Sequence, residues 1–128
     1  MIVDTSVLCA VLFAEPDRED WLRRLNGADR LRAPVTVLVE LGIVLDSRHD
    51  PRASVFSARM IELLGIELEP ITVELAERAR QAHRRYGRGS GHLARLNFGD
   101  CFSYALARQT GEKLLFKGDD FTLTDVAR

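Results

Sequence analysis

The sequence predicts an α/β fold in which a central parallel sheet is covered by helices on both faces. Three observations lead to this prediction. Short apolar segments alternate with longer helical ones, the chain opens on a strand that leads directly into a buried helix, and no internal repeat or linker divides it. Strands alternating with helices imply right-handed crossovers between parallel strands. We therefore expect one three-layer domain spanning residues 1–128.

Four short apolar segments have the length and bounds of buried strands. They cover residues 2–4, 31–34, 66–68 and 113–117. The first ends on Asp4, and the last is broken by Gly118-Asp119-Asp120.

Six segments are predicted to be helices from their apolar spacing and their end signals. The hydroxyls of Thr5 and Ser6 are suited to cap the first helix, and Glu15-Pro16-Asp17 opens the second with proline near its first turn. Asp50 followed by Pro51 caps the fourth, Thr72 caps the fifth, and Gly99-Asp100 begins the last. The expected ranges are 7–13, 15–25, 36–48, 50–65, 72–86 and 99–111.

The composition is that of a soluble globular protein, with 46% hydrophobic and 29% charged residues. No apolar run approaches the roughly 20 residues needed to span a bilayer, and the first residues lack the basic region of a signal peptide. Cys9 and Cys101 form no CxxC or Cys/His cluster. One disulfide is formally possible, but we expect two free, buried thiols in a cytoplasmic protein.

The net charge of −1 hides an uneven distribution of charges. Residues 78–99 contain six arginines and two histidines but no acid. This asymmetry suggests a basic patch beside an acidic centre. Arg84, Arg85 and Arg88 flank the Gly/Ser loop at 87–91 and are candidates for contact with RNA phosphates, although the run also fits a solvated helix face. The loop is not a P-loop, because it lacks the GK[ST] ending and does not follow a strand.

Several carboxylates are expected at one edge of the sheet. Ligands of open parallel sheets bind beyond the carboxyl ends of the strands. Asp4 follows the first strand and Asp119 follows the last, while Asp100 begins a helix on the same side. Glu40 is flanked one turn away by mostly apolar residues, which places its side chain at the margin of a buried stripe. A carboxylate there is costly unless it has a partner such as a cation.

Carboxylates that converge need a counter-charge, since two unit charges about 4 Å apart repel by roughly 4 kcal/mol at an effective dielectric near 20. Mg²⁺ prefers oxygen ligands, and a bound divalent ion can activate water and stabilise a leaving oxygen. The pattern therefore predicts metal-dependent phosphodiester hydrolysis. Each acid also has a purely structural interpretation: a cap for Asp4 and Asp100, an ion pair for Glu40, and a turn for Asp119 and Asp120. The prediction depends on their combination on one face.

The motifs in order resemble the PIN-domain nucleases, and more narrowly the VapC toxins of bacterial toxin–antitoxin pairs. The resemblance is carried by Met-Ile-Val-Asp-Thr-Ser at 1–6, Glu40 on its apolar helix, residues 96–102 with Ala105-Leu106-Ala107, and residues 114–121. It spans essentially the whole chain. It implies a PIN-like fold and an endoribonuclease dependent on Mg²⁺ or Mn²⁺. It also implies a homodimer and a cognate antitoxin that inserts a segment into the active-site groove.

The same resemblance implies an acidic site made of Asp4, Glu40, Asp100 and Asp119, in which Asp4 and Asp100 bind the metal. Thr5 or Ser6 would support Asp4. Relatives of this family often carry Asn where Asp119 stands, so Asp120 remains an alternative fourth acid.

Two other classes of protein fit less well. Phosphotransferases of the haloacid-dehalogenase type need a second acid two residues after the nucleophile, and Ser6 stands there. Receiver modules need an acidic neighbour, which Asp4 lacks. A PIN-like module that binds RNA or a partner without cutting would be expected to have lost one of the acids.

Overall fold

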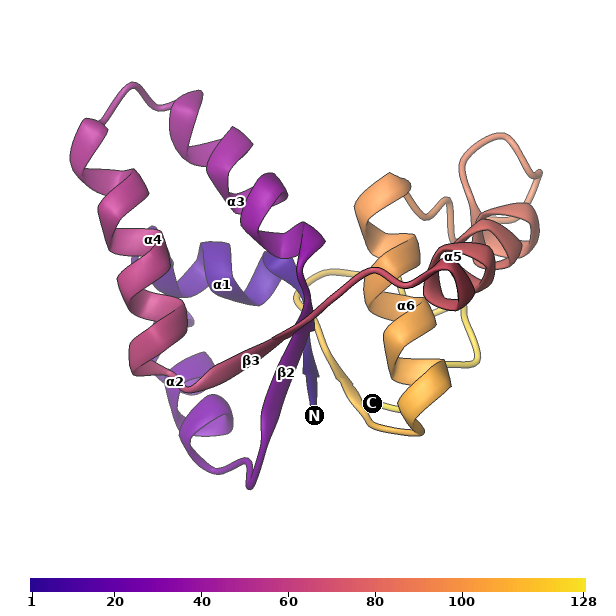
Figure 1. Cartoon of the computed structure of the whole chain (residues 1–128), viewed down its shortest axis with the longest axis horizontal. Helices are drawn as coiled ribbons and strands as arrows, with labels where there is room; N and C mark the ends of the chain where they lie inside the picture. The colour runs from indigo at the N-terminus through magenta and orange to yellow at the C-terminus, as the bar shows by residue number, and fades with distance from the viewer.

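The chain forms a four-stranded parallel sheet with helices on both faces, as the computed structural model shows (Figure 1). The structure describes the backbone of residues 1–128 and all side chains except those of residues 53 and 54. The strands follow the order β3-β2-β1-β4. Their bounds are β1 (Ile2–Val3), β2 (Leu31–Pro34), β3 (Ile66–Glu69) and β4 (Leu114–Leu115). The predicted three-layer α/β architecture is confirmed.

Two groups of helices cover the two faces of the sheet. Figure 1 shows α1, α2 and α4 on one side of the strands and the pair α5 and α6 on the other. The helices are α1 (Thr5–Leu12), α2 (Arg18–Asn26), α3 (Thr36–Asp46), α4 (Pro51–Leu63), α5 (Val73–Tyr86) and α6 (Phe98–Thr110).

Each face of the sheet has its own hydrophobic core, because successive side chains of a strand point to opposite faces. Ile2 and Leu114 belong to the core beneath α5 and α6. Val3 and Leu115 belong to the core formed with α1 to α4. These four side chains are at most 2% exposed, so the short strands β1 and β4 are fixed from both sides.

The strand order creates a reversal between β1 and β4. From β1 the chain builds outward through β2 to β3, and β4 then returns to the opposite edge of β1. Ile2 pairs with Leu114 and Val3 with Leu115, so the two strands end level with each other. Open α/β sheets bind ligands at such a reversal, beyond the carboxyl ends of the strands. Asp4 and the loop after β4 flank this point.

Three helix starts differ from those predicted. Asp4 itself caps α1 by accepting from the Ser6 backbone N–H, so neither Thr5 nor Ser6 is the cap. α2 begins at Arg18, beyond Pro16, and the Asp17 carboxylate binds Lys117 instead of capping the helix. α6 begins at Phe98, with Asn97 as its N-cap.

The two cysteines are free thiols, as expected: Cys101 is buried and Cys9 is partly buried. Among the described residues, no helix combines the length and apolarity needed to cross a membrane.

Candidate active site

Asp4 is held rigidly at the carboxyl end of β1. Its side chain is only 4% exposed. One oxygen, Oδ2, accepts from the Ser6 backbone N–H at 3.0 Å and from the Ser6 hydroxyl at 2.7 Å. The other, Oδ1, accepts from the Ser103 hydroxyl at 2.8 Å. Because Ser103 lies on α6, this bond ties the first strand to the last helix.

Glu40 reaches the same region from α3. Its Oε1 accepts a hydrogen bond from the Thr5 hydroxyl at 3.0 Å, so Thr5 supports Glu40 and not Asp4. Its carboxylate also presses against Gly99 in the first turn of α6, since a Cβ added there would lie 2.0 Å from Glu40 Oε2. Glycine at position 99 is therefore what makes room for this acid.

Asp100 lies in that same turn and is 7% exposed. It is the third residue of α6, not its cap, and it completes a capping box with Asn97. The Asn97 backbone N–H donates to Asp100 Oδ2, and the Asp100 backbone N–H donates to Asn97 Oδ1, both at 2.8 Å. The capping box fixes the carboxylate in place and leaves Oδ1 for another ligand.

The three acids influence one another's ionisation. Burial raises the pKa of Asp100 to about 7. The hydrogen bond from the Asn97 backbone lowers this pKa, and the charges of Asp4, Asp120 and Glu40 raise it further. Burial likewise raises the pKa of Glu40; the hydrogen bond from the Thr5 hydroxyl opposes this, and the charge of Asp4 adds a smaller increase. Full ionisation of the cluster is thus unfavourable without a cation.

The loop after β4 is attached to the beginning of the chain through Lys117. Its backbone N–H donates to the Ser6 hydroxyl at 3.0 Å, and that hydroxyl in turn donates to Asp4. Its ammonium group binds Glu15, and Asp17 at 2.8 Å. This anchorage brings the loop that carries Asp119 and Asp120 to the acidic region.

The two acids of this loop are placed differently. Both side chains are exposed. Asp120 lies close enough for its charge to raise the pKa of Asp100. Asp119 forms a turn, in which its carbonyl oxygen accepts from the backbone N–H and the hydroxyl of Thr122. The effect of its charge on Asp100 makes Asp120 a candidate for the fourth acid alongside Asp119.

The donor set suits a hard divalent cation, although the described His, Cys, Asp and Glu side chains do not enclose an ion as they stand. Its members are carboxylate oxygens, which Mg²⁺ and Mn²⁺ prefer. Buried carboxylates with raised pKa values are the groups that a cation would stabilise most. In addition, the Thr36 hydroxyl is buried without a hydrogen-bond partner among the described groups. It lies one turn before Glu40 on the same face of α3.

The three arginines proposed for RNA contact have different surroundings in the structure. Arg85 forms an ion pair with Asp125 at 3.4 Å and lies 4.8 Å above the Tyr86 ring. Asp125 also accepts from the Tyr104 hydroxyl at 2.5 Å. Arg85 therefore helps to fix the C-terminal segment, while its side chain stays 64% exposed. Arg84 and Arg88 are exposed at the end of α5 and in the following loop.

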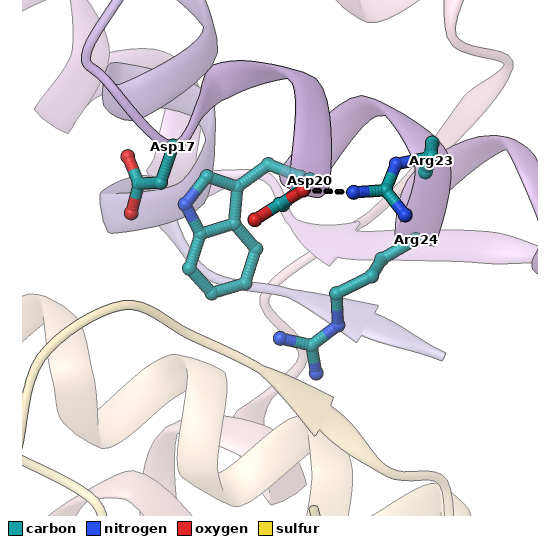
Figure 2. A pocket seen from close by; sticks show the side chains of 5 residues that line it. Asp17, Asp20, Arg23 and Arg24 are labelled. Carbon is teal, nitrogen blue, oxygen red and sulfur yellow. Dashed lines mark hydrogen bonds and ion pairs between the residues drawn. The ribbon is translucent and has the colours of Figure 1, made fainter.

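A hollow on α2 is a different feature from this acidic site. Figure 2 shows it with Asp17, Asp20, Arg23 and Arg24 around it, and Trp21 also contributes. Its acids are engaged by cations: Asp20 binds Arg23, and Asp17 binds Lys117. The candidate chemistry therefore remains at Asp4, Glu40 and Asp100.

Comparison with known proteins agrees with the fold and with the motifs. Residues 1–127 match the PIN domain. The chain is 48% identical over 128 residues to Ribonuclease VapC28 of Mycobacterium tuberculosis, covering 100% of this chain and 96% of the relative. It is 44% identical to Ribonuclease VapC42 of the same species, covering 98% and 96%.

Solved structures show the same architecture. The crystal structure of Mycobacterium tuberculosis VapC20, described as a Sarcin-Ricin loop cleaving toxin, superimposes with a TM-score of 0.80 at 23% identity and covers 98% of this chain and 95% of that one. A toxin–antitoxin complex from Klebsiella pneumoniae matches with a TM-score of 0.70 at 19% identity, covering 97% and 92%.

Proposed function

Since the chain belongs to the PIN domain family, we propose that it is a VapC-type endoribonuclease that hydrolyses RNA phosphodiester bonds with Mg²⁺ or Mn²⁺. One observation carries the proposal. Three carboxylates from β1, α3 and α6 meet at the sheet reversal, where burial and mutual repulsion raise the pKa values of Asp100 and Glu40. Such an arrangement is costly for stability alone and is suited to binding a cation.

Each residue has a separate task in this mechanism. Asp4 and Asp100 would hold the cation, which when bound would supply a polarised water and a positive charge near the leaving oxygen. Ser6 and Ser103 fix the orientation of the Asp4 carboxylate. Glu40, oriented by Thr5, accepts the proton of the attacking water at its carboxylate, and its raised pKa makes it a better base near neutral pH.

The substrate and partners follow the same family. We propose that exposed Arg84, Arg85 and Arg88 attract the RNA backbone. We propose a cytoplasmic antitoxin partner, in keeping with the related complex from Klebsiella pneumoniae, and a homodimer. The exposed Val39 and Ile43 on α3 offer apolar surface for assembly. A module that binds RNA without cutting is not favoured, because all of the acids are present and the relatives named above are ribonucleases.

The first test is cleavage of a structured RNA by the purified chain. We expect cleavage with Mg²⁺ or Mn²⁺, none in EDTA, and a loss of at least about 100-fold in Asp4→Asn, since removal of an outer-shell partner alone costs 10–100-fold. Asp29→Asn, an exposed acid elsewhere, is the control and should cleave like the parent. Equal rates for Asp4→Asn and the parent would show that the site is wrong.

The second test separates the two acids of the loop. We expect Asp120→Asn to lower the cleavage rate by about 10–100-fold, the usual cost of losing a group that tunes a metal site. We expect Asp119→Asn to change it less than about threefold, because Asp119 contributes its backbone carbonyl to a turn. Rates measured at saturating Mn²⁺ and in a Mn²⁺ titration would decide, and the reverse order would assign the role to Asp119.

A further inference from the structure

A hollow of about 420 Å³ is lined by residues of α5 and α6. Its floor is apolar and includes Ala79, Cys101 and Phe102. Its rim carries Arg80 and His83 from α5 and Phe98 from α6. Phe98 directly precedes Gly99 and Asp100, so one edge of the hollow and two residues of the acidic site share the first turn of α6.

Phe98 is unusual because its ring is 75% exposed, whereas the Phe102 ring beneath it belongs to a residue only 9% exposed. The two rings meet at 5.0 Å between centroids with an interplanar angle of 71°. This edge contact holds the Phe98 ring in place. The helix does not need a phenylalanine here, since Asn97 and Asp100 already cap it.

The charge around the hollow is positive. No acid is among its described lining residues, and Arg80 and His83 are its only charged or titratable groups apart from the Cys101 thiol. Arg84 extends the same face of α5, one turn after Arg80. A flat aromatic surface beside cations is the combination that binds single-stranded nucleic acid, in which bases stack and phosphates pair with arginine.

We propose that Phe98 is a specificity residue that stacks on one unpaired base of the RNA, while Arg80 contacts an adjoining phosphate. This inference rests on the proposed nuclease function and adds a requirement to it. A base inside a duplex is already stacked and paired, so only an unpaired base can occupy the hollow. The stacked base then sets which phosphodiester lies at Asp4 and Asp100.

The test compares Phe98→Ala with the parent on an RNA that contains an unpaired segment. We expect kcat/KM to fall by about 5- to 150-fold, as for the loss of one stacked base, mainly through a higher KM. Phe98→Trp should retain activity. Leu93→Ala, which removes a side chain 80% exposed in the loop before α6, is the matched control and should be unchanged.

A set of RNAs with single abasic nucleotides provides the decisive measurement. One abasic position should lower kcat/KM of the parent as much as the substitution Phe98→Ala does. The same abasic RNA should cause no further fall in kcat/KM when the Phe98→Ala variant is the enzyme. If every abasic effect adds fully to that of Phe98→Ala, or if Phe98→Ala cleaves like the parent, the subsite is overturned. Dissociation of a dimer by Phe98→Ala together with full additivity would assign the face to a second copy. If the parent cleaves RNA and Asp4→Asn does not, the proposed nuclease function stands whether or not the Phe98 subsite is overturned.

Discussion

Replacing Asp100 with asparagine is expected to abolish cleavage and, in EDTA at pH 8, to make the protein more stable. The loss of activity should be at least about 100-fold, since a proposed metal ligand is removed. The gain in stability follows because asparagine carries no charge into a site that is 7% exposed. The capping box survives, since the amide oxygen of asparagine can still accept from the Asn97 N–H.

The pH dependence of unfolding measures this cost directly. The pKa of Asp100 rises from its ordinary value of 3.8 to about 7 in the folded state. The folded protein therefore binds more protons than the unfolded chain between these two values, and its stability falls as pH rises from about 4 to 7. A shift of about three units corresponds to a loss on the order of 4 kcal/mol.

We would measure Tm in EDTA from pH 4 to 8 for the parent and for Asp100→Asn. The parent should lose stability over this range, and Mn²⁺ should restore more of it at pH 8 than at pH 5, because the cation competes with protons. Asp100→Asn should show a flatter profile and a smaller response to Mn²⁺. A variant less stable than the parent at pH 8 would mean that the charge of Asp100 stabilises the metal-free fold.

The fold was predictable because its signals are local. Buried strands and amphipathic helices show in the spacing of apolar residues, so the four strands were placed within one or two residues of β1 to β4. The helix starts were less predictable, because an acid can cap a helix only if its carboxylate is not already bound by a residue from elsewhere in the chain. Asp17 cannot cap α2 while Lys117, 100 residues away, holds its carboxylate.

The acids of the site were predictable individually, whereas the contacts that orient them were not. Ser103 lies 99 residues from Asp4, and neither residue signals the bond between them. One signal could have found Ser103: it lies one turn after Asp100, on the helix already assigned to the site. Arg85 shows the same limit, because its charge was visible in the sequence but its partner Asp125 was not.

Gly99→Ala should slow cleavage strongly with little loss of stability. The added Cβ would lie 2.0 Å from Glu40 Oε2, so the carboxylate must move away from the first turn of α6. The atoms displaced are the end of a flexible side chain, which keeps the cost to folding low. Alanine also favours the helix over glycine by about 0.5–1 kcal/mol. We expect a fall in cleavage of about 10–100-fold and a Tm within a few degrees of the parent.

Gly42→Ala is the matched control, since Gly42 also lies within a helix, α3, and a Cβ there would meet no atom within 4 Å. It should retain full activity and gain slightly in Tm. Shortening the acid in the double variant Gly99→Ala/Glu40→Asp should recover part of the lost rate, because the carboxylate retreats by one methylene. A general defect of α6 would lower Tm and would not respond to Glu40→Asp. Partial rescue at an unchanged Tm would therefore show that the position of the Glu40 carboxylate against α6 controls the rate.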